Sequence, residues 1–326
     1  MRAVVLESHG GTDVLQIAEI PPPEPGPEEV AVSVKATALN RADLLQRMGL
    51  YAGPKMPHEI PGLEFAGTVT AVGDRVETAN VGDEVMGIVG GGAYAEQLTT
   101  HERMLLPIPA SLDFDDAAAI PEVFITAFDA LVLQGGMASG KTALVHAGAS
   151  GVGTAAIQIC KAIGAQIAVT CSTGKVSACE RLGADAVIDY STADFVEGVR
   201  ELTAGRGADM VLDVIGGDYT NRNIDALAVN GRIIQVGLMG SGKADINLGG
   251  LLAKRASITG TTLRARPIEQ KIVTSQRFVS EMLPLVADGR LRPVIDSRYP
   301  LDEIAAAHGY MESNANIGKI LIDVAG

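Results

Sequence analysis

The sequence predicts an α/β protein, in which a doubly wound parallel sheet of six strands follows a smaller β-rich region. Two observations predict this fold. A glycine-rich turn at residues 147–153 joins an apolar run to a helical period. Apolar runs then alternate with helical runs, and they lie at 142–147, 166–170, 186–190, 208–214, 232–237 and 257–262. Residues 1–120 instead carry short extended runs separated by turns.

The β-rich region begins with extended runs at 2–6 and 30–39, separated by a proline-rich loop at 21–29. Gly-Asp turn signals follow within GTVTAVGDRV and VGDEVMGIV, as in a compact barrel or sandwich. The tail has strand-like runs around a short helix, and we expect it to return to this region because the six-strand sheet is already complete. The predicted domains are therefore 1–120 with 290–326, and 121–289 for the nucleotide-binding sheet.

The glycine turn has the pattern G-x-x-G-x-G, with Gly148, Gly151 and Gly153 between an apolar strand and a helix. This context makes a dinucleotide-binding motif credible. Glycines let the backbone approach a pyrophosphate, and the helix N-terminus offers N–H groups and a positive dipole end. We expect Gly151, Val152 and Gly153 to contact the cofactor through backbone N–H groups. Ser150 either bonds a phosphate or is present only because it is small.

The end of the next strand predicts which nucleotide binds. NAD enzymes usually place a carboxylate about 20 residues after the glycines, to bind the ribose 2′-hydroxyl. Here the segment reads Cys171, Ser172, Thr173, Gly174 and Lys175, with no carboxylate. Small hydroxyls and a lysine suit a 2′-phosphate, so the sequence predicts NADPH. The alternative is that Lys175 is only a solvated residue of the following helix.

Composition excludes several classes of partner and site. The 26 basic and 39 acidic residues give a net charge of −13, which disfavours nucleic acid and anionic membranes. Residues 1–10 show no signal-peptide pattern and the sequence has no 18-residue apolar stretch, so we expect a soluble, cytoplasmic protein with no membrane partner. The three cysteines include no C-x-x-C, and the five histidines form no ligand-spaced cluster. We therefore expect no metal site.

Several segments extend the argument from the nucleotide motif to the whole chain. They are ALNRADLLQRMGLY at 38–51, PGLEFAG at 61–67, AAAIPEVFITAF at 117–128, HAGASGVGTAAIQ at 146–158, DVIGG at 213–217, LAVNGRIIQVGLMG at 227–240 and YMESNANIGKI at 310–320. In their order and spacing the chain resembles the zinc-independent quinone oxidoreductases of the medium-chain dehydrogenase/reductase superfamily, the zeta-crystallin group.

The resemblance implies a GroES-like substrate domain, a Rossmann domain, and NADPH held in the cleft between them. It also implies a homodimer formed by the edges of the Rossmann sheets, through the run at 257–265. Zinc-bearing relatives carry a Gly-His-Glu stretch where this chain has Leu63 and Glu64, and the first domain has no cysteine. The chemistry of zinc alcohol dehydrogenases is therefore excluded by the missing ligands.

The resemblance also implies site residues. Asn40 and Asp43 match family positions near the nicotinamide and the quinone, where they would fix a ribose or polarise the substrate. Asn40 is alternatively, or in addition, the N-cap of a helix. Tyr51 matches a tyrosine that lies against the quinone, and its alternative is a loop residue packed on the barrel.

The remaining expected cofactor residues lie in the nucleotide-binding region. Thr126 matches a family position near the nicotinamide, and Tyr190 would complete the 2′-phosphate site with Ser172 and Lys175. The other expected neighbours of the nicotinamide end the fifth and sixth strands, and they are Gly237, Leu238, Met239, Thr262 and Leu263. Arg264 and Arg266 receive no role.

The predicted activity is NADPH-dependent reduction of quinones or similar electron-poor carbonyls, without zinc. The rival enzyme is an NADPH-dependent enoyl or alkenone reductase, which has the same fold but must protonate an enolate carbon. A further alternative is a crystallin-like or RNA-binding protein that keeps NADPH as a stabiliser, although the net charge disfavours RNA.

Overall fold

The computed structural model describes residues 1–54 and 57–325, which form two compact units. Unit 1 comprises Met1–Ile125 and Arg264–Gly326, and unit 2 comprises Thr126–Leu263. The first unit is thus discontinuous, and the chain returns to it at residue 264, whereas the sequence predicted a return at 290. The reason is that helix α9 (Ile268–Glu281) packs on strand β7 and the turn before it, and α10 (Leu283–Ala287) packs on α9.

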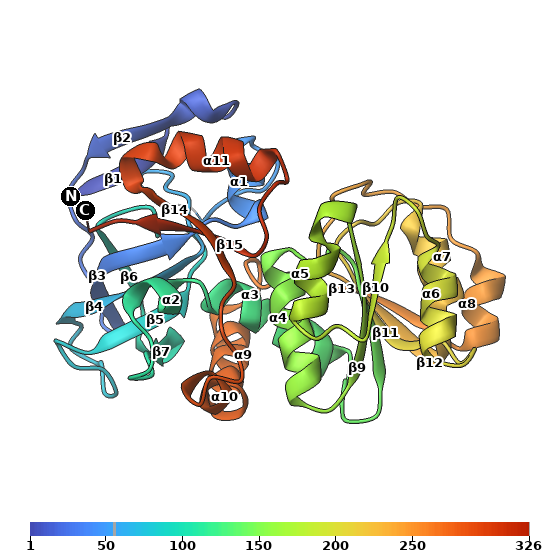
Figure 1. The fold of residues 1–326 in the computed structure, drawn as a ribbon. Helices are drawn as coiled ribbons and strands as arrows, with labels where there is room; N and C mark the ends of the chain where they lie inside the picture. Colours follow the sequence, from blue (N-terminus) through green and yellow to red (C-terminus); the bar gives the residue numbers. More distant parts are fainter. Residues whose placement is uncertain (55–56, 326) are drawn as a thin grey trace. The chain divides into compact units, whose positions relative to one another are not determined.

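Unit 1 is built on an antiparallel sheet with strand order β14-β15-β3-β4-β5-β7, and β6 pairs with β3 (Figure 1). A separate β1–β2 hairpin lies outside this sheet. The strands are β1 (Arg2–Leu6), β2 (Leu15–Glu19), β3 (Glu29–Ala38), β4 (Glu64–Val72), β5 (Glu84–Ile88), β6 (Gln97–His101), β7 (Leu105–Pro107), β14 (Ile295–Pro300) and β15 (Lys319–Asp323). The β14–β15 pair is the parallel exception.

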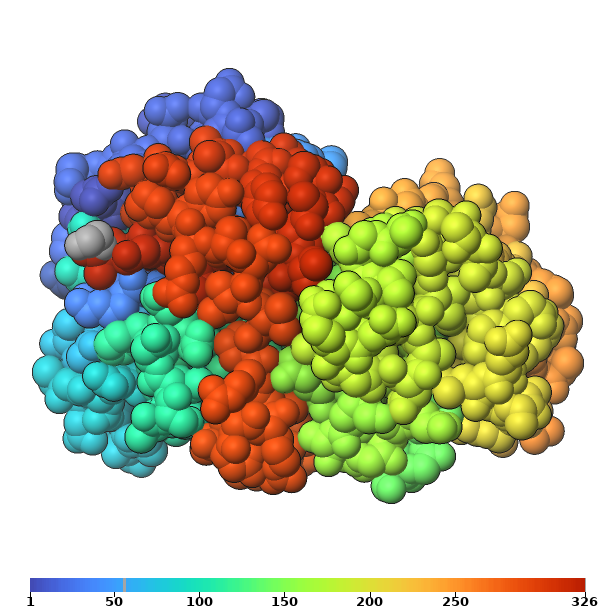
Figure 2. All heavy atoms as spheres, in the orientation of Figure 1, coloured from blue at the N-terminus to red at the C-terminus, as the bar shows by residue number. Residues whose placement is uncertain are grey.

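The C-terminal tail enters this sheet because β15 pairs antiparallel with β3, with Leu321 opposite Ala38. Its side chains Ile320 and Ile322 join an apolar core with Val32 and Phe65. Figure 2 shows the red C-terminal segment packed beside the blue N-terminal residues. The other helices of this unit are α1 (Arg41–Arg47), α2 (Phe114–Ala118) and α11 (Ile304–Glu312), while α3 (Pro121–Phe128) leads into unit 2.

Unit 2 is a doubly wound parallel sheet with strand order β10-β9-β8-β11-β12-β13. The strands are β8 (Thr142–Val145), β9 (Gln166–Cys171), β10 (Ala186–Asp189), β11 (Ala208–Asp213), β12 (Leu227–Gln235) and β13 (Ser257–Gly260). The helices are α4 (Gly151–Ala162), α5 (Val176–Arg181), α6 (Phe195–Leu202), α7 (Tyr219–Ala226) and α8 (Leu248–Lys254). All six predicted strands are confirmed as elements, with ends that differ by a few residues.

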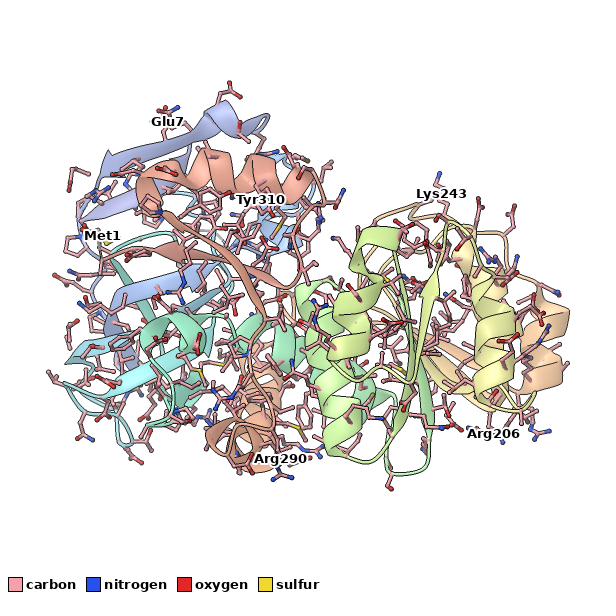
Figure 3. All side chains as sticks on the ribbon, viewed as in Figure 1. Met1, Glu7, Arg206, Lys243, Arg290 and Tyr310 are labelled. Carbon is pink, nitrogen blue, oxygen red and sulfur yellow. The ribbon has the colours of Figure 1, made fainter. Side chains whose placement is uncertain are left out.

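The strands of the parallel sheet run in the same direction, so their carboxyl ends lie along one side of it, which we call the carboxyl edge. The turns that follow the strands lie at this carboxyl edge. In Figure 3, Lys243 lies beyond β12 at this edge, and Arg206 lies before β11 at the opposite one.

Among the described residues no helix is long and apolar enough to cross a membrane.

Candidate active site

The glycine turn between β8 and α4 is fixed by close backbone packing. A Cβ added to Gly148 would lie 2.5 Å from the Cβ of Val169, and one on Gly153 would lie 2.3 Å from the carbonyl oxygen of Ala147. The Oγ of Ser150 accepts a hydrogen bond of 3.0 Å from the N–H of Gly153. Ser150 is therefore the N-cap of α4, and its hydroxyl proton remains available as a donor.

The predicted 2′-phosphate residues come together at the ends of β9 and β10. The backbone N–H of Tyr190 donates to the carbonyl of Cys171, which directly precedes Ser172, and the N–H of Lys175 donates to the carbonyl of Ser172. Ser172 and Lys175 are half-buried, whereas Tyr190 is exposed. The three residues thus share one corner of the carboxyl edge.

A carboxylate that sequence reasoning missed lies at the same corner. Asp189 ends β10, opposite Cys171 in the sheet register. Its oxygens accept hydrogen bonds from the backbone and hydroxyl of Ser191 and from the hydroxyl of Thr173. The Ser191 and Thr173 hydroxyls, in that order, lower the pKa of Asp189. The sequence signal was available, because the last residue of a neighbouring strand lies at the same edge.

The remaining cofactor candidates, apart from Thr126, also follow carboxyl ends of strands. Leu238 and Met239 are exposed beyond β12, and the side-chain amide of Gln235 holds this turn by donating to the carbonyl of Gly237. Thr262 is exposed and Leu263 half-buried beyond β13. Thr126 lies on α3, where it is half-buried while its neighbour Ile125 is buried.

The turns after β8 and β11 are tied together by a buried polar network. Nε2 of His146 lies 2.7 Å from Oδ1 of Asn223, whose Nδ2 donates to Oδ2 of Asp213. Because Nδ2 is used as a donor, Oδ1 of Asn223 accepts, so Nε2 of His146 carries a proton. Burial, as the largest cause, lowers the pKa of His146. Asp213 also accepts from the backbone N–H of Ile215. His146 therefore has a structural role.

In unit 1, Asn40 and Asp43 lie at the start of α1. The carboxylate of Asp43 accepts hydrogen bonds from the backbone N–H groups of Asn40 and Gly62 and from the hydroxyl of Tyr94. Burial raises the pKa of Asp43 to about 6, and these hydrogen bonds oppose the rise. The side chain of Asp43 is fully buried, so it supports the local backbone from inside the domain.

The side chain of Asn40 belongs to a buried ion pair between Glu64 and Lys319, whose charged atoms lie 2.7 Å apart. Asn40 donates to Glu64 and accepts from Lys319, at 2.9 and 2.6 Å. The second oxygen of Glu64 accepts from the backbone N–H of Glu122, in the first turn of α3. One ion pair thus holds the first turns of α1 and α3. Sequence reasoning named Glu64 only as a departure from the zinc-bearing pattern.

Tyr51 follows α1 and is half-buried. The guanidinium of Arg264 lies over its ring, with 4.8 Å between Cζ and the ring centroid. No sequence signal linked these residues, which are far apart in the chain. Arg264 is therefore added to the candidate site, although the sequence analysis assigned it no role.

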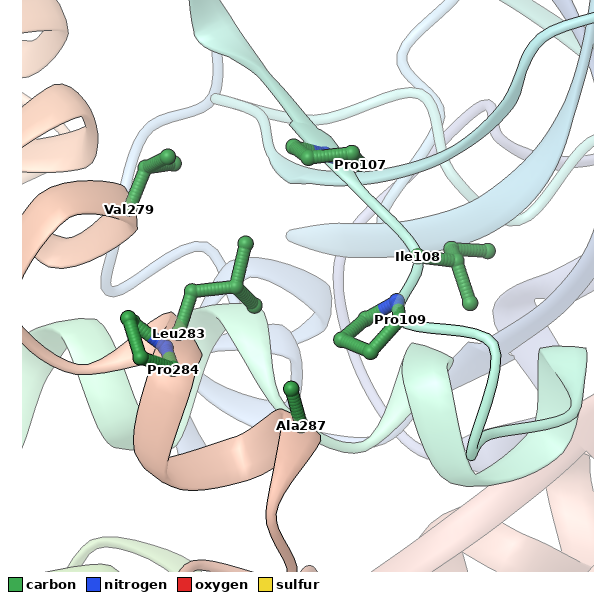
Figure 4. A pocket seen from close by; sticks show the side chains of 7 residues that line it. All are labelled: Pro107, Ile108, Pro109, Val279, Leu283, Pro284 and Ala287. Atoms are coloured by element: carbon green, nitrogen blue, oxygen red, sulfur yellow. The ribbon is translucent and has the colours of Figure 1, made fainter.

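A shallow hollow in unit 1 lies apart from these residues (Figure 4). It has a volume of about 270 Å³, and none of the predicted site residues lines it. Its lining is apolar and comprises Pro107, Ile108, Pro109, Val279, Leu283, Pro284 and Ala287. Among the described residues, no group of three or more histidines, cysteines or carboxylates has a geometry that could hold a metal ion.

Comparison with known proteins identifies the family. Residues 26–110 match the alcohol dehydrogenase GroES-like domain, and residues 182–322 match a family described as zinc-binding dehydrogenase. A quinone oxidoreductase of Pseudomonas aeruginosa is 33% identical over 98% of this chain and 99% of its own length. The chain belongs to the zinc-independent quinone oxidoreductases of the medium-chain dehydrogenase/reductase superfamily.

Other relatives carry different names. The synaptic vesicle membrane protein VAT-1 homologue of Rattus norvegicus is 32% identical over 99% of this chain and 84% of its own length. The Escherichia coli quinone oxidoreductase complexed with NADPH has a TM-score of 0.89 at 30% identity, covering 99% of this chain and all of that one. The structure of an NAD-dependent alcohol dehydrogenase also has a TM-score of 0.89, at 36% identity, and the match covers all of this chain and all of that one.

Proposed function

We propose that this protein reduces quinones, or similar electron-poor carbonyl acceptors, with NADPH and without zinc. The observation that carries this proposal is the carboxyl edge of the unit 2 sheet, where the glycine turn lies at the same edge as Lys175 and Tyr190. Relatives named quinone oxidoreductase, one of them complexed with NADPH, support it. NADPH, when bound, supplies the reducing electrons.

The cofactor would be held by backbone and side-chain donors of unit 2. The N–H groups of Gly151 and Val152, at the start of α4, have no acceptor within the helix and suit the pyrophosphate, whereas the N–H of Gly153 already donates to Ser150. Lys175, Ser172 and Tyr190 would hold the 2′-phosphate through charge-assisted hydrogen bonds. The nicotinamide would be bordered by Thr126 and by the turns after β12 and β13. Gly148 and Gly153 keep the turn before α4 tight, because an added Cβ would collide with Val169 or with the carbonyl of Ala147.

On the acceptor side, we assign the direct contact to Tyr51. Its phenol can stack on a quinone ring and donate to an oxygen as that oxygen gains negative charge. Asn40 and Asp43 would act by holding α1, since their polar atoms already bond to other parts of unit 1. A quinone oxyanion is weakly basic and can take its proton from water, so the reaction needs no dedicated acid.

Replacement of Tyr51 tests this assignment. In Tyr51→Ala, we expect kcat/KM for 1,2-naphthoquinone to fall roughly ten-fold or more while the Kd for NADPH stays unchanged. Tyr51→Phe separates the two contributions, because it keeps the ring and removes the hydroxyl. Unchanged quinone reduction in Tyr51→Ala would remove Tyr51 from the acceptor site.

A second candidate activity is NADPH-dependent reduction of enones or enoyl thioesters. It is favoured by the similarity to the JamJ enoyl reductase, with a TM-score of 0.89 and 26% identity over 99% of this chain and 98% of that one. An enoyl reductase must protonate carbon. Preference for a small enone over quinones would promote this activity, and the search would then turn to a proton donor.

We also propose a homodimer formed through the edge strand β13. The nearby helix α8 supports it, because Leu248 and Leu252 are 64% and 76% exposed. In light scattering, we expect twice the monomer mass for the wild type and the monomer mass for Leu252→Glu. The control is Val81→Glu, which changes an apolar residue of unit 1 that is 64% exposed. A monomeric wild type would contradict the proposal.

A further inference from the structure

Arg264 makes a cation–π contact with the tyrosine that we assign to the acceptor. Its Cζ lies 4.8 Å from the centroid of the Tyr51 ring. Both residues belong to unit 1, and Arg264 is the first residue after the chain leaves unit 2. It directly follows Leu263, a candidate neighbour of the nicotinamide. Arg264 therefore contacts the residue that we assign to the acceptor, and along the chain it is joined to a residue that we expect near the nicotinamide.

The guanidinium is held in place by hydrogen bonds to three residues in two segments of unit 1. Nε donates to the carbonyl of Gly90 at 2.6 Å, and Nη2 donates to Oε1 of Gln46 at 2.6 Å. Nη1 donates to the carbonyl of Tyr51 at 3.4 Å. These bonds immobilise a side chain that would otherwise have several rotamers. The position of the positive charge relative to the Tyr51 ring is thus set before any acceptor binds.

The charge of Arg264 is not neutralised by direct contact. Within residues 1–54 and 57–325, no carboxylate lies within ion-pair distance of it, because the amide of Gln46 stands between Arg264 and Glu59. A guanidinium has five N–H donors, and the described residues accept from three of them. A second positive charge, that of Lys271, lies nearby. Burial and then the charge of Arg264 lower the pKa of the Lys271 amine.

We propose that Arg264 determines acceptor specificity: it holds the ring of Tyr51 and selects quinones that carry an acidic substituent, such as a sulfonate or carboxylate. The inference rests on the proposed function and deepens it. The two remaining N–H groups suit an anionic oxygen pair, and a planar guanidinium binds such a group better than an ammonium does.

The test compares a neutral and an anionic acceptor of the same ring system. We would measure kcat/KM for 1,2-naphthoquinone and for 1,2-naphthoquinone-4-sulfonate, with NADPH, in wild type, Arg264→Lys and Arg264→Met. The ratio of sulfonate to neutral quinone should fall roughly ten-fold or more in Arg264→Met and less in Arg264→Lys. The control is Arg103→Met, which removes an exposed arginine of the same unit and should leave the ratio unchanged.

An equal loss for both quinones in Arg264→Met would overturn the inference and leave Arg264 a purely structural role. If that variant fails to fold, the wild type still decides. Its preference for the sulfonate should shrink as sodium chloride is added, because salt screens charge attraction. A preference that salt does not change would contradict the inference.

Binding separates this inference from the proposed function. We would titrate wild type and Arg264→Lys with anthraquinone-2-sulfonate by calorimetry, in the presence of NADP⁺. Tighter binding to the wild type would support the role of Arg264 even if no quinone were turned over, whereas equal affinity would refute it. Failure of the wild type to reduce either quinone would refute the proposed function alone.

Discussion

Replacing Lys175 with alanine should distinguish the two nicotinamide cofactors. Lys175 is half-buried, and it shares the ends of β9 and β10 with Ser172 and Tyr190. A charge-assisted hydrogen bond to the 2′-phosphate contributes about 1.5–3 kcal/mol, which corresponds to about a 10- to 150-fold increase in Kd for NADPH. The lower part of that range applies here, because the side chain is partly solvated and the carboxylate of Asp189 lies at the same corner. NADH has no 2′-phosphate, so its Kd should change little.

The assay is equilibrium titration of both cofactors, followed by calorimetry or by the fluorescence of the reduced nicotinamide. The matched control is Lys161→Ala in the same unit, which removes a lysine paired with Asp185 and should change neither Kd. Equal weakening of NADPH and NADH by Lys175→Ala would refute the 2′-phosphate assignment. Tight NADH binding by the wild type would refute the preference for NADPH.

Three further predictions concern charged or titratable groups. Asp189→Asn should lower the Kd for NADPH a few-fold at low salt without changing that for NADH, since it removes a negative charge; unchanged titrations would refute this. Lys319→Met should reduce the unfolding free energy in urea by about 3–5 kcal/mol, because it leaves Glu64 buried without its partner, whereas a loss below about 1 kcal/mol, as for an exposed pair, would contradict this. Burial, and secondarily Arg47, lowers the pKa of His308 from 6.5 to about 3, so stability from this residue is lost as pH falls through that interval. His308→Leu should therefore reduce the slope of unfolding free energy against pH there by about 1.4 kcal/mol per pH unit, and an unchanged slope would count against it.

Asp43 acts on the same pH range with the opposite sign. Its folded pKa of about 6 lies above the ordinary value of 3.8, so the folded state holds this proton more tightly than the unfolded chain does. The cost of its buried charge therefore grows as pH rises from 3.8 to 6. The comparison of His308→Leu with the wild type isolates the histidine, because Asp43 is present in both proteins.

The fold was predictable because its signals are local. Each parallel strand of unit 2 is a short apolar run, and Gly148, Gly151 and Gly153 mark the turn where the first strand meets its helix. The return of the tail to unit 1 followed from counting strands. The residue at which the chain returns could not be predicted in this way. Helix α9 has the amphipathic pattern of any surface helix, and only packing decides which strand it covers.

The site was predictable only where it follows the order of the strands. Residues after β8, β9 and β12 reach the carboxyl edge by topology alone. By contrast, Arg264 meets Tyr51, and Lys319 meets Glu64, through contacts between distant segments. Periodicity does not encode such pairs, and a lysine in a β-strand gives no sign that it will be buried against a carboxylate. Asp189 also reaches this edge by topology, as the last residue of β10, but its hydrogen bond to Thr173 depends on the register between neighbouring strands, which a single sequence leaves open.

The measurement that tests the central claim most directly is NADPH oxidation by the purified protein with 1,2-naphthoquinone, 1,4-benzoquinone and a small enone, assayed side by side. The account predicts rapid turnover of the quinones, slow reduction of the enone, and activity that a zinc chelator does not change. Faster reduction of the enone, or no oxidation of NADPH by either quinone, would contradict it.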